Sequence, residues 1–382
     1  MTIGTEHEYS INDQDFRPLP INDRIIQEIN GEVVNEFQFG DVNLSKELQK
    51  NVIEIVPTVP GTSVQGLERT LYGGLQRLYA ATQDRYRFLG LGMHPLLKLE
   101  QTAVWDHEDK EIYQLYDRLF DIKQHGWLNI QAIQINVPFS DGEEMVRLFN
   151  RTRAIIPYLV AIGASSPFVE GKLTDNEDNR LIYYRDNQRK MPIIAHGVIP
   201  EKLRSMQDYL DIQQEMYREL RKHDAEILCH EWVDSRGVIV RFSRNCVEIK
   251  AIDEQECLHS DMAITALSLA LLRSKEFSLT DDEGDLRSLT EEAIHHGTLN
   301  IKPELRQVLD IALRSANGDE RPYLALIKKR IEQGSLAELM RQRAAEGVRP
   351  ILEEMADSLR TNLPYHGLKD SHVYKFGPAP SL

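Results

Sequence analysis

Cysteine is scarce in this sequence. Its 382 residues include only three cysteines, Cys229, Cys246 and Cys257. Three cysteines at these spacings suit neither a disulfide framework nor a thiolate zinc site. We interpret them as buried thiols in a protein of a reducing compartment.

Positive charge is also in deficit. Lysine and arginine together number 45 against 60 aspartate and glutamate residues, which gives a net charge of −15 and a sequence pI near 5.3. No cluster of basic residues interleaved with aromatic ones offers the surface that a phosphate backbone requires. The sequence therefore argues against nucleic acid as a partner.

Long hydrophobic runs are missing as well. The longest apolar stretch, Ile155 to Phe168, contains Pro157 and is too short to span a bilayer. The opening residues, MTIGTEHEYS, lack the basic and apolar regions of a signal peptide. We expect a cytoplasmic protein with no membrane partner.

The patterns that are present describe a globular chain, with 41% hydrophobic and 27% charged residues. No repeat, low-complexity tract or linker divides the chain before about residue 270. Short strand-like runs alternate there with long amphipathic stretches, which indicates an α+β fold. The predicted strands are Thr5–Ile11, Val52–Val56, Ile133–Val137, Val238–Phe242 and Val247–Ile252.

Helical patterns fill the remainder of the chain. Helices are predicted over Val64–Tyr86, Lys202–Lys222 and Asp261–Arg273, and from a capping box that spans Ser140 to Glu143. After about Ser274 the pattern is wholly helical, with starts at Pro303 and Pro322 and a capping box from Ser335 to Glu338. We expect residues 1–275 to contain the sheet, residues 276–382 to form a helical region packed on it in one structural unit, and Thr361–Leu382 to form a surface tail.

Carboxylates occupy strand positions where apolar side chains are expected. Glu6 and Glu8 are two residues apart and share one face of the first strand, while Glu54 and Glu248 each interrupt an apolar strand. Taken alone, the first pair could be an acidic edge strand exposed to water. Several strand carboxylates that converge can instead hold a hard divalent cation, and magnesium in proteins usually shares its ligands with substrate phosphates.

Two neutral polar side chains belong to the same pattern. Gln134 and Asn136 share one face of the strand that runs through Ile133–Val137, and the apolar residues share the other. They either line a cleft or form the wet face of a half-exposed strand.

At this point the chain resembles glutamate-cysteine ligases of the second type, the carboxylate-amine ligases of the glutamine synthetase-like superfamily. The resemblance covers roughly residues 1–275, and its motifs occur in the family's order. They are Gly4-Thr5-Glu6-His7-Glu8, Glu47-Leu48 with Glu54, Gly92-Met93-His94-Pro95, Ser165-Ser166-Pro167-Phe168 with Gly171, and Val247-Glu248-Ile249-Lys250.

The resemblance implies a curved, mainly antiparallel catalytic sheet backed by helices, with metals held by sheet carboxylates. It assigns metal binding to Glu6, Glu8, Glu54, Glu248 and Glu47. Because Glu47 and Glu54 are an odd number of residues apart, Glu47 must lie before the strand or across a bulge.

The resemblance also implies roles for basic and polar residues. Arg180, or its rival Arg185, would grip the substrate carboxylate, and Gln134 and Asn136 would line the substrate site. Arg241 and Lys250 would face the transferred phosphoryl group. The remaining assignments are Arg236, Arg241 and Lys250, with Arg244 nearby, as nucleotide contacts and His94 as either a substrate contact or a structural turn residue.

Two segments depart from the family pattern. Gln134 and Asn136 stand where many members carry histidines, and Lys250 stands where an arginine is usual, so that its charge remains but the planar fork is lost. The arginines near Lys250 would supply what it lacks, or are surface charges paired with acidic neighbours.

We therefore predict an ATP- and Mg²⁺-dependent ligase, with Mn²⁺ as a possible substitute, that forms an amide bond through an acyl phosphate. Glutamate and cysteine are the expected substrates, and a different amine or carboxylate is the first alternative. A metal-dependent amidase and a non-catalytic binding protein are the further alternatives, and a homodimer is a possible assembly.

Overall fold

Strand β1 (Gly4–Asn12) is the centre of the sheet. The computed structural model describes residues 2–367. The strands follow the order β2-β3-β4-β1-β6-β10-β9, β5 also pairs with β1, and each neighbouring pair is antiparallel. The other strands of this sheet are β2 (Glu36–Phe39), β3 (Val42–Lys46), β4 (Val52–Pro57), β5 (Arg87–Leu89), β6 (Ala132–Pro138), β9 (Val238–Arg241) and β10 (Cys246–Asp253).

The five predicted strands are confirmed, and the expected α+β fold with a mainly antiparallel sheet is correct. The hairpin of β2 and β3 and the short β5 were not predicted. Gly40 turns that hairpin with a φ of 71°, a backbone conformation that glycine adopts without strain.

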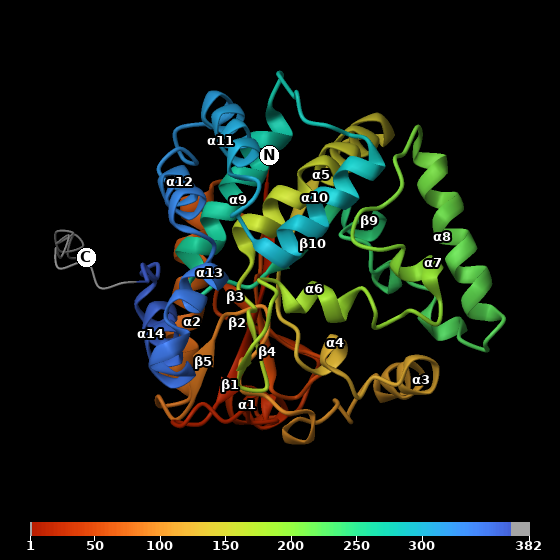
Figure 1. The fold of residues 1–382 in the computed structure, drawn as a ribbon. Helices are drawn as coiled ribbons and strands as arrows, with labels where there is room; N and C mark the ends of the chain where they lie inside the picture. Colours follow the sequence, from red (N-terminus) through yellow and green to blue (C-terminus); the bar gives the residue numbers. More distant parts are fainter. Residues whose placement is uncertain (1, 368–382) are drawn as a thin grey trace.

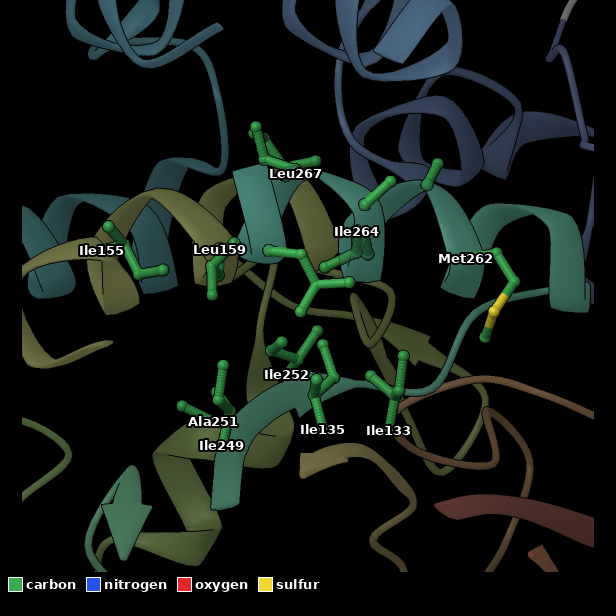
Figure 2. Close-up of a cluster of buried hydrophobic side chains, with 14 of the residues drawn as sticks. Ile133, Ile135, Ile155, Leu159, Ile249, Ala251, Ile252, Met262, Ile264 and Leu267 are labelled. Carbon is green, nitrogen blue, oxygen red and sulfur yellow. The ribbon is translucent and has the colours of Figure 1, made fainter. Parts of the chain in front are cut away.

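One face of the sheet is apolar and packs against two helices, α5 (Gly142–Gly163) and α9 (Leu258–Arg273). Figure 2 shows Ile135 and Ile249 of the sheet below Leu159 of α5 and Ile264 of α9. Side chains alternate between the two faces of a strand, so burying these isoleucines sends their neighbours to the opposite face. Each fully buried isoleucine contributes roughly 1.5 to 3 kcal/mol.

The starts of two helices test the predicted capping boxes. For α5 the predicted capping box was wrong by one residue: Asp141 is the N-cap and accepts the Glu144 N–H at 2.8 Å, while the Glu144 carboxylate accepts the Ser140 N–H. The box of Ser335 and Glu338 is confirmed. The other predicted helices occur with shifted ends, as α2 (Val64–Ala81), α8 (Met206–Arg221) and α9.

The C-terminal part is helical, as expected. Helices α11 and α12 pack against α9, and α10 packs against α5 (Figure 1). Their apolar side chains share the core that lies under the sheet. The elements are α10 (Glu283–His296), α11 (Lys302–Ser315), α12 (Leu324–Gln333), α13 (Leu336–Gln342) and α14 (Val348–Thr361).

Further elements join these layers at the surface. They are α1 (Asn22–Asn30), α3 (Lys110–Phe120), α4 (His125–Leu128), β7 (Phe168–Val169), β8 (Lys172–Leu173), α6 (Asn179–Tyr184) and α7 (Pro192–Ala195). Among residues 2–367, no helix combines the length and the hydropathy that crossing a membrane requires. The tail expected over Thr361–Leu382 falls mainly outside the described residues.

Candidate active site

The polar face of the sheet gathers the predicted carboxylates. Glu8 of β1 lies opposite Glu54 of β4, Glu6 lies opposite Gln134 of β6, and Glu248 of β10 lies opposite Asn136. These residues come from four adjacent strands and occupy the face that turns away from the apolar core. Glu47 follows β3 and precedes β4, which is one of the two places that its odd spacing allows.

Three of these carboxylates converge. One oxygen from each of Glu8, Glu47 and Glu54 lies within 4.8 Å of the others. Glu8 and Glu54 are buried, with exposed fractions of 7% and 8%. In the described part of the chain, none of the ion pairs includes any of these three carboxylates. The three carboxylates therefore lie together without a direct ion pair to a lysine, arginine or histidine of the described chain.

Burial and mutual repulsion make this cluster hard to ionise. Burial, followed by the charge of Glu47, raises the pKa of Glu8 to about 8. The pKa of Glu54 is raised well above its ordinary value, first by burial and then by Glu6, Glu47 and Glu8. Burial also raises the pKa of Glu47. A cation placed among them would favour the charged forms.

Two arginines approach the carboxylates on the other side. Arg244 pairs with Glu6 at 2.5 Å, and Arg241 pairs with Glu248 at 2.8 Å. The second oxygen of Glu248 is buried without a hydrogen-bond partner, and burial, followed by Glu6, raises the pKa of this group. Glu54, Glu8, Glu6 and Glu248 form what we call the carboxylate row. Arg241 and Arg244 thus face this row.

Gln134 and Asn136 hold the carboxylates of β1. The Gln134 side-chain amide donates to Glu8 Oε1 at 3.0 Å, and the Asn136 amide donates to Glu6 Oε1 at 3.0 Å. The open question about this strand is settled in favour of a polar face that lines the carboxylate row.

A pocket of about 140 Å³ lies at one end of the row, beside Glu8. Arg180, Lys250, Tyr184 and Gln134 line it. Burial alone lowers the pKa of Lys250, but Tyr184 and Glu248 outweigh that effect and raise it, so the amine is charged. Two cations at the wall of a small polar pocket suit a carboxylate ligand.

Asp253 fixes Arg180 in that wall. The Arg180 Nε donates to Asp253 Oδ1 at 2.6 Å, and its terminal nitrogens lie 3.4 Å from the Lys250 carbonyl oxygen. Asp253 also accepts from the Ser165 N–H at 3.0 Å and from the Ser166 hydroxyl at 2.7 Å. Ser165 and Ser166 therefore orient Asp253, and Asp253 in turn orients Arg180.

A second pocket, of about 240 Å³, lies at the opposite end of the row, beside Glu6. Its lining combines the apolar Val56, Pro57 and Pro138 with Arg244 and Cys246. The two pockets and the carboxylates between them follow the direction of β1 and β6.

Comparison with known proteins identifies the family. The model of glutamate-cysteine ligase family 2 matches residues 2–360. The chain belongs to this family. An uncharacterised protein of Archaeoglobus fulgidus is 47% identical over 95% of this chain and 100% of its own length. The chloroplastic glutamate-cysteine ligase of Arabidopsis thaliana is 27% identical over 44% of this chain, and the match spans only 35% of the plant protein.

A solved structure supports the same fold. The glutamate-cysteine ligase of Francisella tularensis in complex with AMP superposes with a TM-score of 0.67, at 12% identity, over 96% of this chain and 90% of its own. With its membership of glutamate-cysteine ligase family 2, the chain is an ATP-dependent carboxylate-amine ligase with a glutamine synthetase-like fold.

Two arginines that the family resemblance assigned to the site have other partners. Arg236 is 1% exposed and binds Glu201 at 2.8 Å and Asp234 at 3.2 Å. Arg185 forms a surface pair with Glu291. None of these contacts involves the carboxylate row. Arg236 is a paired charge, as one alternative held, but it is buried and not at the surface.

His94 belongs to a buried turn. Its Nδ1 accepts the Leu96 N–H at 3.1 Å, and Asn129 bonds both its backbone N–H and its carbonyl oxygen. Burial lowers its pKa to about 4, so the ring is neutral. Of the two roles considered for His94, the geometry favours the structural one.

Sequence reasoning missed Asp253, although a signal existed. It ends β10 and opens a run of four polar residues, Asp253 to Glu256, that are all buried. A polar run directly after an apolar strand marks side chains that must find partners, because unpaired buried polar groups are costly.

Proposed function

We propose that this chain is a glutamate-cysteine ligase that joins the γ-carboxylate of glutamate to the amine of cysteine and consumes ATP. The observation that carries the proposal is the cluster of Glu8, Glu47 and Glu54, which takes part in none of the ion pairs of the described residues and lies between a cationic pocket and a larger, partly apolar one. Such a cluster suits a divalent ion shared with phosphates.

The residues present fit magnesium. Carboxylate oxygens are its preferred protein ligands, and one oxygen from each of Glu8, Glu47 and Glu54 lies within 4.8 Å of the others. Glu8, Glu47 and Glu54 would hold one ion, and Glu6 with Glu248 would hold a second. Bound magnesium supplies charge neutralisation for the phosphates.

Arg180 and Lys250 would bind the carboxylate end of the amino acid in the 140 Å³ pocket. The second pocket, at about 240 Å³, is the larger of the two and has a partly apolar lining, so it suits a nucleotide base better than this one does. Arg241 and Arg244 would neutralise the ATP phosphates, and the apolar end of the 240 Å³ pocket would accept the base.

The reaction then has two balanced steps. An oxygen of the substrate carboxylate attacks the γ-phosphorus, and the bond from phosphorus to the ADP oxygen breaks. The amine nitrogen attacks the resulting acyl carbon, loses its proton, and the bond from carbon to the phosphate oxygen breaks. The protein contributes placement and charge, which dominate phosphoryl transfer.

The test incubates purified protein with Mg-ATP, L-glutamate and a panel of amino acids and amines, and measures ADP release and product mass. The proposal predicts ADP release that requires both glutamate and cysteine, with one γ-glutamylcysteine per ADP. ADP release with another amine or carboxylate would keep the ligase class and replace the substrates. In a parallel incubation without ATP, cleavage of added γ-glutamylcysteine would indicate an amidase, and no turnover with any pair would refute the proposal.

A further inference from the structure

Along one edge of strand β1, none of the described strands pairs with Glu8, whereas Glu54 of β4 lies opposite it on the other edge. The first edge pairs with β6 over Gly4–His7 and with β5 over Ser10–Asn12. Between these two partners, the Glu8 N–H donates to a side chain, the Glu254 carboxylate, at 3.1 Å. A carboxylate thus replaces the missing backbone acceptor at the residue that carries a proposed metal ligand.

Glu254 is itself fixed from the core side of β1. Its other oxygen lies 3.1 Å from His7 Nδ1, and Asp261 Oδ2 lies 3.4 Å from the same nitrogen. The second ring nitrogen, Nε2, lies 2.9 Å from the Thr5 hydroxyl. His7, Glu254, Asp261 and Thr5 are all 0% exposed. A buried carboxylate is costly unless its oxygens have hydrogen-bond partners. The contacts with His7 and with the Glu8 N–H supply such partners and hold the Glu254 side chain in one orientation.

The side chain of Glu8 is held as well as its main chain. The Glu8 carboxylate accepts the Ala132 N–H at 2.9 Å, where β6 begins, while Glu254 accepts the Glu8 N–H. The main chain and the side chain of Glu8 are therefore both held at the point where β1 and β6 separate.

We propose that Glu254, held by His7, is a positioning residue for Glu8 and thereby for the divalent ion. This inference rests on the proposed function, in which Glu8 ligates that ion. Groups that orient a metal ligand from behind typically change metal affinity or activity 10- to 100-fold when they are removed.

Two substitutions remove the hydrogen-bond acceptors of Glu254 to different extents. Glu254→Met removes both acceptors. Glu254→Gln keeps one oxygen, so either the Glu8 N–H or the His7 N–H loses its acceptor. The matched control is Glu256→Met, because Glu256 is also 0% exposed but contacts Arg330 at 2.7 Å and the Ser260 hydroxyl, away from β1.

The first measurement is hydrogen exchange of the β1 peptide in metal-free protein, and the second is calorimetric titration with Mn²⁺ alone. We expect Glu254→Met to speed exchange at Glu8 and to lower Mn²⁺ affinity about 10- to 100-fold. Glu254→Gln should show a loss of roughly three- to tenfold in the same direction. The control variant should match the wild type in both measurements.

Wild-type exchange and affinity in Glu254→Gln would overturn the inference, even if Glu254→Met does not fold. Equal losses in the control would also overturn it, since the effect would then be general destabilisation. A wild-type protein that does not bind Mn²⁺ would contradict the proposed function, while exchange at Glu8 would still decide whether Glu254 positions the strand.

Discussion

Replacing Glu54 by glutamine should stabilise the metal-free protein and destroy its activity. Glu54 is 8% exposed, and its neighbours Glu8 and Glu47 offer oxygens within 4.8 Å. At an effective dielectric constant of 20, two unit charges at that separation repel by roughly 3 to 4 kcal/mol. Partial protonation relieves part of this, so we expect a gain of about 1 to 3 kcal/mol in the free energy of unfolding at pH 8.

The sign follows from the direction of the pKa shifts. The pKa of Glu8 rises from 4.5 to about 8 on folding, and the pKa of Glu54 is also raised. A carboxyl group with a raised folded pKa stabilises fully below its unfolded pKa, and this contribution is lost as the pH rises through the folded pKa. For Glu8 the window runs from about pH 4.5 to about pH 8, and the shift corresponds to roughly 4 to 5 kcal/mol.

Thermal unfolding in EDTA between pH 5 and pH 9 measures the stability, and ADP release with Mg-ATP measures the activity. In Glu54→Gln the melting temperature should rise by roughly 2 to 4 °C at pH 8, its decline with pH should flatten, and turnover should fall about a hundred- to a thousand-fold. The control is Glu68→Gln, because the pKa of Glu68 is lowered, against the opposing effect of burial, by His259 and Tyr323.

Glu68→Gln should therefore lose stability and keep its activity. A Glu54→Gln protein that is less stable than the wild type and equally active would refute the reasoning, because Glu54 would then be an ordinary structural side chain.

Three further variants test the surroundings of the site. Arg180→Lys should raise the KM for the carboxylate substrate at least tenfold and leave the KM for ATP unchanged, since the planar fork held by Asp253 is lost; ADP release at varied glutamate measures it. Arg236→Met should cost roughly 3 to 5 kcal/mol in urea unfolding by leaving Asp234 buried without its partner, and a changed KM for ATP without lost stability would contradict its structural role. Gly92→Ala should lower the melting temperature, because its Cβ would lie 2.1 Å from Asp253 Cγ; an unchanged melting temperature would contradict that packing.

Strand periodicity was sufficient to predict the carboxylate face. Glu6 and Glu8 had to share a face, and isolated glutamates in apolar strands, Glu54 and Glu248, had to turn away from the core. The register then places them opposite one another or opposite Gln134 and Asn136. Local alternation therefore determined which face is polar, and pairing determined which residues meet.

The partners of the buried arginines could not be predicted in this way. Arg180 and Arg236 are both fully buried, yet one meets Asp253 in the pocket wall and the other meets Asp234 and Glu201. The contacts with Asp253 and Glu201 join segments distant in sequence, so they depend on the three-dimensional path of the chain. The prediction of the start of α5 failed for a local reason, because Asp141 caps the helix in place of the neighbouring Ser140.

The most direct test of the account is an anomalous diffraction map from crystals soaked with Mn²⁺ and a non-hydrolysable ATP analogue. The account predicts a peak within coordination distance of Glu8, Glu47 and Glu54, with the γ-phosphate of the analogue beside it. A fully occupied analogue with no peak among these three carboxylates would contradict the claim that they hold the divalent ion.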